Sequence, residues 1–114
     1  MRSSQVFLRF LHLSQAVSGD IDTRLDLTAL RLLEIVASAH ATSAPMTVSD
    51  TMKLRYIASP ATLHRKIDQL RDAGFITQVF EGTNRRTKYL VPTASADKYF
   101  DQLGKAMVTA QQGT

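Results

Sequence analysis

The chain has 114 residues, of which 44% are hydrophobic and 21% are charged, with a formal net charge of +4 and a pI of about 9.8. These values are ordinary for one globular domain, which at this length buries roughly two-thirds of its unfolded surface. The lack of cysteine excludes disulfides, thiolate metal sites and cysteine redox sensing, and no run approaches the ~20 apolar residues that cross a membrane.

The first predicted element is a helix over about residues 4–17, which Ser18, Gly19 and Asp20 end. Its apolar side chains extend over nearly half of the circumference, more than one packing surface requires. We therefore expect this helix either to be deeply buried or to pack against both its own core and a second subunit. The apolar residues are Val6, Phe7, Phe10, Leu11, Leu13 and Val17.

Two helices are predicted next. The first is capped by Thr28 and runs to about Ala41, and it should be central because its leucines point in several directions. We expect burial of Leu27, Leu30, Leu33, Val36 and Ala37, with Leu32 and Ile35 pointing elsewhere. After a loop over 42–46, Thr47 begins a short helix that ends near Leu54, and Asp50 approximates a capping box.

The segment 59–74 carries the clearest helix signals in the chain. Ser59 is a good N-cap and Pro60 suits the first helical position, where its missing N–H costs nothing. A core-facing stripe follows, made of Leu63, Ile67 and Leu70, and Gly74 ends the helix. A short helix, a turn of about four residues and this basic helix make a helix-turn-helix.

The remaining elements are a hairpin and a last helix. β-Branched and aromatic residues over 75–80 and 87–91 flank a turn at 82–84, and Pro92 closes the second strand. The inward and outward alternation is imperfect, so the strand register is left open. Thr93 caps a helix to about Gln111, which has these residues on or beside its apolar face: Ala96, Tyr99, Phe100, Leu103, Met107 and Ala110.

The charge is concentrated in one part of the chain. Residues 1–52 carry a net charge of −1 and residues 89–114 carry none, whereas residues 53–88 carry eight basic and three acidic groups, a net of +5. This excess coincides with the capped helix and the hairpin. Such clustering is typical of a nucleic-acid surface.

A helix-turn-helix followed by a basic hairpin predicts a mainly α winged helix with a two- or three-stranded wing. The recognition helix, 59–73, would read base edges in the major groove, and the wing, 80–91, would contact phosphates or the minor groove. Arg65 can bond to guanine and Gln69 to adenine. The full predicted DNA-binding set is Ser59, Ala61, Thr62, His64, Arg65, Gln69, Thr83, Asn84, Arg85, Arg86 and Lys88.

These motifs resemble the MarR family of bacterial winged-helix transcription regulators, best over residues 25–95. The similarity lies in Leu27-Thr28, in the segment from Ser59 through Gly74-Phe75-Ile76, and in Asn84-Arg85-Arg86 followed by Leu90-Val91-Pro92-Thr93. Asn84 stands where the family usually has an acidic residue, so a charged brace would become a neutral hydrogen bond.

The resemblance implies a homodimer built from the terminal helices and names Arg86 as the wing arginine. Residues 1–114 would then form a single domain, with a core at 27–92 and dimerisation helices at 1–18 and 93–112. The predicted interface consists of Val6, Phe7, Phe10, Leu11, Tyr99, Phe100, Leu103 and Met107. Because the family often binds aromatic anions among such helices, a small aromatic effector is a candidate partner.

Other functions find little support in the sequence. The three histidines, at 12, 40 and 64, have no metal-ligand spacing, and no nucleophile–base pair, carboxylate dyad or phosphate-binding glycine loop is visible. We therefore expect that the protein is not an enzyme and holds no cofactor or metal. We expect instead a cytoplasmic regulator that binds double-stranded DNA. The alternatives are a winged-helix protein-interaction module without DNA binding, and a plasmid or phage replication or partition protein with the same domain.

Overall fold

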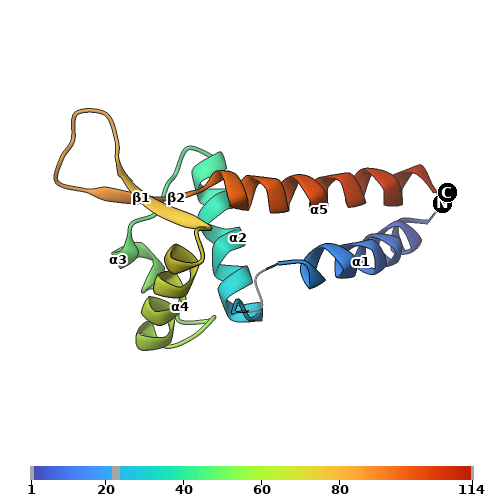
Figure 1. Cartoon of the computed structure of the whole chain (residues 1–114), viewed down its shortest axis with the longest axis horizontal. Coiled ribbons are helices and arrows are strands. Elements are labelled where there is room, and N and C mark those ends of the chain that lie inside the picture. Colours follow the sequence, from blue (N-terminus) through green and yellow to red (C-terminus); the bar gives the residue numbers. More distant parts are fainter. Residues whose placement is uncertain (1, 22–23, 114) are drawn as a thin grey trace. The chain divides into compact units, whose positions relative to one another are not determined.

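The computed structural model describes residues 2–21 and 24–113 (Figure 1). The described elements, in chain order, are α1 (Ser3–Gly19), α2 (Leu27–Ala41), α3 (Val48–Thr51), α4 (Pro60–Asp72), β1 (Ile76–Phe80), β2 (Lys88–Pro92) and α5 (Ala94–Gln112). They group into two compact units: a core unit of residues 23–96 and a two-helix unit of residues 1–22 with 97–114. The mainly α fold class and the two-stranded form of the wing are confirmed.

The hydrophobic centre of the core unit is built by α2, α4 and the hairpin. The predicted stripe of α4 is confirmed, because Leu63, Ile67 and Leu70 are all buried. Leu90 of β2 is buried as well, and α2 packs against both α4 and β2. The helix that precedes the helix-turn-helix therefore supports both α4 and the wing.

The sequence prediction for α2 was wrong in two respects. Asp26, not Thr28, is the N-cap: its Oδ1 accepts a hydrogen bond from the Ala29 N–H at 2.9 Å. Leu27 is 84% exposed, whereas Leu32 is fully buried. A carboxylate at a helix N-terminus is favoured by the helix dipole, and Leu27, directly after the cap, lies outside the buried stripe of Ala29, Leu32, Leu33 and Val36.

The other predicted caps are confirmed. Thr47 Oγ1 accepts from the Asp50 N–H at 3.1 Å while Asp50 Oδ2 accepts from the Thr47 N–H at 2.9 Å, a reciprocal capping box. The helix that it begins is shorter than predicted and ends at Thr51 rather than near Leu54. Ser59 Oγ accepts from the Thr62 N–H at 3.3 Å, with Pro60 in the first turn of α4.

The hairpin is antiparallel and pairs Ile76 with Pro92 and Phe80 with Lys88. A single bridge joins Met46 to Leu90, so the third strand of the wing is reduced to one backbone hydrogen bond, from Leu90 N to Met46 O at 2.7 Å. Gly74 leaves α4 at a φ of 81° and Gly82 turns the tip at 57°, conformations that glycine adopts without steric cost.

Thr93 connects the end of the hairpin to α5. Its hydroxyl donates to the Gly74 carbonyl and accepts from the Ala96 N–H at 3.4 Å, which confirms the predicted cap. Its backbone N–H donates to the Phe75 carbonyl at 3.1 Å. The exit of α4 and the start of α5 are thereby fixed to each other.

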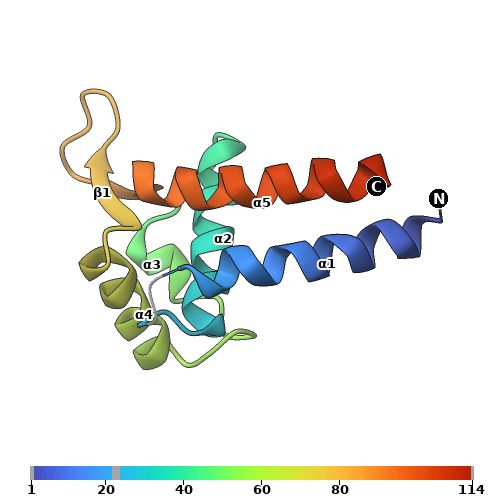
Figure 2. The same cartoon turned by 45° about the vertical axis from the view of Figure 1, so that its right-hand side comes forward.

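In the two-helix unit, α1 and α5 run side by side (Figures 1 and 2). α1 has no buried residue. Two alternatives were predicted for this helix, and the first of them, deep burial within its own chain, is therefore not observed. Phe7 is 58% and Leu8 is 61% exposed on α1, and Met107 and Val108 are exposed on α5. None of the described helices is long and apolar enough to span a membrane.

Candidate nucleic-acid interface

The N-terminal half of α4 presents a connected row of polar side chains. The Ser59 hydroxyl donates to Thr62 Oγ1 at 3.1 Å, and Arg65 Nη2 donates to the same oxygen at 3.5 Å. Arg65 is exposed and uses one neutral partner, so most of its guanidinium donors remain available. Ala61 and His64 are also exposed, and Thr62 is half-buried.

Gln69 and Lys66 differ from the rest of the helix surface. Gln69 is half-buried, and its Oε1 is out of contact with solvent and without a hydrogen bond among the described residues. Contact with an adenine therefore requires its amide to rotate outward. Lys66 is only 12% exposed, and its Nζ lies 2.7 Å from Asp26 Oδ2.

The Asp26–Lys66 pair fixes α4 against the start of α2. The hydrogen bond from Lys66, and next the one from the Ala29 N–H, hold the pKa of Asp26 below its ordinary value. Lys66 thus helps to hold α4 in place and is not itself part of the candidate interface. Sequence reasoning missed this pair, because the two residues are 40 positions apart and no local pattern connects them.

The cations of the wing differ in their surroundings, because two of them lie beside an aromatic ring. Arg85 Cζ and Lys88 Nζ each lie 5.5 Å from the centroid of the Phe80 ring, within the range of a cation–π interaction. Asn84 Oδ1 accepts from the Arg86 backbone N–H at 2.9 Å, so the predicted neutral hydrogen bond forms with the backbone of Arg86 and not with its guanidinium. Thr83, Asn84, Arg85 and Arg86 are all exposed.

Phe80 was not among the predicted site residues, although it organises two of them. A detectable signal existed: an aromatic residue ends the first strand, and cations follow five and eight positions later. A second such pair joins α2 to the segment before α4: Arg31 Cζ of α2 lies 5.7 Å from the ring centroid of the exposed Tyr56. Both pairs keep guanidinium groups at the surface.

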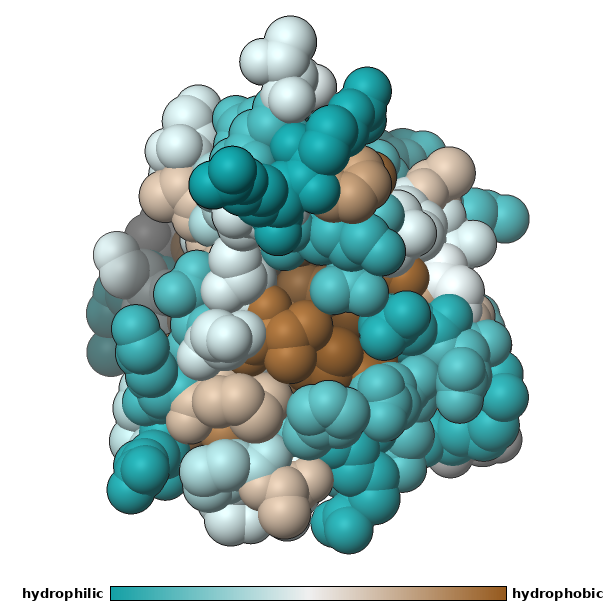
Figure 3. All heavy atoms as spheres, turned by 90° about the vertical axis from the view of Figure 1, so that its left-hand side faces the viewer, coloured by the Kyte–Doolittle hydropathy of each residue, from teal (hydrophilic) through white to brown (hydrophobic). Residues whose placement is uncertain are grey.

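Seen from the wing side, the surface of the protein is mostly hydrophilic around a smaller hydrophobic area (Figure 3). Neither Arg65 nor Arg86 forms an ion pair with a carboxylate in the part of the chain that the structure describes. Cations without acidic partners are free to neutralise an external anion. The surface formed by α4 and the wing therefore suits a polyanion.

The predicted interface residues lie on α1 and α5 with unequal exposure. Phe7, Leu11 and Met107 are exposed, and Tyr99 is only 8% exposed in the single chain. Val6, Phe10, Phe100 and Leu103 are intermediate. Leu8 and Val108, which were not predicted, are more than half exposed and are further apolar side chains on the surface of the two helices.

Comparisons with known proteins identify the fold. No family model and no curated protein matches the sequence. The S. aureus MepR structure bound to ethidium bromide is similar with a TM-score of 0.72 and 16% identity, over 98% of this chain and 79% of that one. A MarR-like transcriptional regulator from Thermotoga maritima gives 0.62 and 15%, over the same two shares.

A third solved structure is an S. aureus MepR variant bound to an oligodeoxyribonucleotide, with a TM-score of 0.62 and 17% identity over 98% of this chain and 80% of that one. At such identities the likeness shows the fold alone. This chain has the winged-helix fold of MarR-like transcriptional regulators, which confirms for the fold the resemblance drawn from the sequence motifs.

Proposed function

We propose that this protein is a sequence-specific, homodimeric DNA-binding transcription regulator that inserts α4 into the major groove and sets its wing on phosphates or in the minor groove. The observation that carries the proposal is the pair of exposed guanidinium groups of Arg65 and Arg86, on the two elements that a winged helix presents to DNA. Both belong to the basic segment 53–88. A similar fold bound to an oligodeoxyribonucleotide supports the same conclusion.

The two arginines have different roles in this proposal. Arg65, near the N-terminus of α4, reads a base edge, since a guanidinium bonds in bidentate fashion to guanine. Arg86 at the wing tip contacts phosphate or the minor groove without reading sequence. Ser59, at the N-terminus of α4, offers a hydroxyl and backbone N–H groups to a phosphate.

The homodimer rests on the exposed apolar side chains of the two-helix unit. Four large hydrophobic residues, Phe7, Leu8, Met107 and Val108, are each more than half exposed. Exposed apolar surface on this scale is typical of an interface, and two-fold symmetry would place two α4 helices about one DNA turn, ~34–36 Å, apart. The operator is then a pseudo-palindrome.

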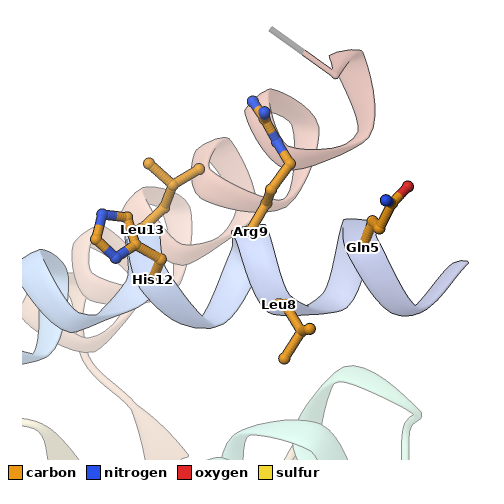
Figure 4. Close-up of a pocket in the computed structure, with 5 residues that line it drawn as sticks. All are labelled: Gln5, Leu8, Arg9, His12 and Leu13. Atoms are coloured by element: carbon orange, nitrogen blue, oxygen red, sulfur yellow. The ribbon is translucent and has the colours of Figure 1, made fainter. Parts of the chain in front are cut away.

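The proposal includes a small aromatic effector, which would bind in a groove on α1. The groove has a volume of ≈ 620 Å³ and is lined by Gln5, Leu8, Arg9, His12 and Leu13. Figure 4 shows Gln5, Arg9 and Leu13 on one side of the helix and Leu8 on the other. All lining residues come from one helix, so enclosure of a ligand requires a second subunit.

Selection of bound sequences from a random duplex pool tests the proposed function. We expect one enriched pseudo-palindrome with half-sites one helical turn apart. Binding of duplex without any enrichment would exclude a sequence-specific regulator. The absence of duplex binding, together with capture of a defined protein partner, would favour the interaction module instead, which has no reason to place its basic excess on α4 and the wing.

A further inference from the structure

The C-terminal half of α4 carries two carboxylates on the surface that the proposed function turns toward DNA. Asp68 is half exposed and Asp72 is exposed. A carboxylate near phosphates opposes binding by charge repulsion, so these groups need neutralisation when the complex forms. The surroundings of Asp68 show which groups supply it.

Two side chains of α4 lie near the two oxygens of the Asp68 carboxylate. His64 Nδ1 lies 3.4 Å from Asp68 Oδ2, and Arg71 Nη1 lies 3.9 Å from Asp68 Oδ1. Asp68, Arg71 and Asp72 line a polar groove of ≈ 660 Å³ together with Lys88, Thr77 and Gln78 of the hairpin and the buried Ile76. Asp68 thus lies where α4 meets the wing.

His64 is the histidine of this group, the side-chain type whose ordinary pKa lies nearest to neutral pH. Its side chain is 61% exposed, and Asp68 is its ion-pair partner within 4 Å in the described chain. Two acidic groups at the starts of other helices in the core unit are engaged elsewhere, Asp26 with Lys66 and Asp50 with Thr47, and Glu34 of α2 is exposed. From the hairpin, Lys88 faces the same groove.

A charged imidazole donates from both ring nitrogens, whereas a neutral one donates from only one. With Nδ1 beside the Asp68 carboxylate, a charged His64 keeps Nε2–H for an outside acceptor. Such a ring would offset the charge of Asp68 and add one hydrogen bond to DNA in the same protonation step. A neutral ring that donates through Nδ1 would instead present Nε2 as an acceptor.

We propose that His64 and Asp68 form a proton-linked contact of the DNA-binding surface, in which binding takes up one proton from solvent on His64 and Asp68 positions the ring. Asp68 is a positioning residue, and the Nε2–H of His64 donates to a phosphate oxygen or to guanine N7 or O6. The inference rests on the proposed function and adds a regulatory property to it. Affinity for DNA rises as the pH falls.

The test measures the Kd of the full chain for its selected duplex and for a mixed-sequence duplex between about pH 6 and pH 8, the range in which histidine changes charge, at constant ionic strength. Full linkage changes Kd by about tenfold per pH unit for each proton taken up, and we expect several-fold tighter binding at the acidic end. Equal pH slopes on both duplexes identify a phosphate contact. A slope confined to the selected duplex identifies a base contact.

Three variants separate this contact from a structural role. His64→Gln should abolish the pH slope, whereas His40→Gln, on α2 of the same unit, should retain it. Asp68→Asn should bind DNA more tightly at about pH 8, because a negative charge is gone, yet show a shallower slope. The thermal unfolding transition of each variant checks that it folds.

A wild-type slope in either His64→Gln or Asp68→Asn would overturn the proton-linked contact. So would a Kd of the wild-type chain that is independent of pH, and this result would leave the proposed function intact. A chain that binds no duplex at any pH would contradict both the proposed function and this contact.

Discussion

The connection between α2 and α4 can be tested by replacing Asp26. Asp26→Ala removes the N-cap bond to Ala29, worth about 1 kcal/mol, and the 2.7 Å contact with Lys66. The Asp26 side chain is 53% exposed, so the ion pair counts as a surface pair of about 0.5–1 kcal/mol. We expect the free energy of unfolding to fall by about 1.5–2 kcal/mol in total.

Equilibrium urea unfolding measures this loss, with Thr28→Ala as the matched control. The control alters a threonine two residues further on, whose side chain caps nothing in the structure, and it should cost less than about 0.5 kcal/mol. Asp26→Ser keeps a capping oxygen and should recover about half of the loss. A larger destabilisation by Thr28→Ala than by Asp26→Ala would refute the assigned cap and return it to the position read from the sequence.

The pH dependence of the same measurement has a defined sign. Because the pKa of Asp26 is lowered in the folded state, its contribution to stability is complete above the ordinary carboxyl pKa of about 3.9 and is lost as the pH falls through the lower folded value. The difference in stability between wild type and Asp26→Ala should therefore be constant near neutrality and shrink below about pH 4. A difference that grows on acidification would contradict the assigned interaction.

Three further predictions concern binding and assembly. Arg65→Ala should reduce discrimination at one base pair of each half-site by about 1–3 kcal/mol, measured with single-substitution duplexes; unchanged discrimination would exclude Arg65 as a reader. Phe80→Ala removes the ring that holds Arg85 and Lys88, and it should weaken all duplexes alike in a mobility-shift titration, whereas a change in base preference would show a reading role. Leu8→Glu places a charge on the exposed apolar face of α1 and should shift sedimentation from dimer to monomer; a wild-type sedimentation profile would argue against α1 as an interface.

Local signals were sufficient for most of the fold. The caps at Thr47, Ser59 and Thr93 were predicted correctly because each depends on a side chain and a backbone N–H three residues away. The core stripe of α4 was also predicted, since helical periodicity alone defines it. These features need no knowledge of the rest of the chain.

Features that depend on distant partners could not be predicted. Asp26 and Thr28 are both acceptable caps by sequence, and Asp26 additionally contacts Lys66, 40 residues away. The burial of Leu32 and the exposure of Leu27 depend on which side of α2 meets α4 and β2. The hairpin register likewise depended on cross-strand pairing, such as that of Phe80 with Lys88.

For the wing, the residues of the candidate surface and the special role of Arg86 were predicted, but the contacts of the other cations were not. Arg85, Arg86 and Lys88 were predicted together, and the structure separates them: Arg85 and Lys88 lie over the Phe80 ring, whereas Asn84 bonds to the backbone of Arg86. That distinction favours Arg86 as the proposed phosphate contact of the wing. Arg86→Ala should therefore lower affinity for every duplex and reduce the salt slope, with Lys105→Ala on α5 as a charge-matched control.

The central claim is that the cations of α4 and the wing neutralise DNA phosphates, and a salt titration of Kd with a mixed-sequence duplex tests it most directly. If each subunit of a dimer neutralises roughly four phosphates, log Kobs should fall against log[salt] with a slope of about −7, and Arg86→Ala should make that slope shallower by about 2 per dimer. A binding constant that does not change with salt, or a slope that Arg86→Ala leaves unaltered, would contradict the account.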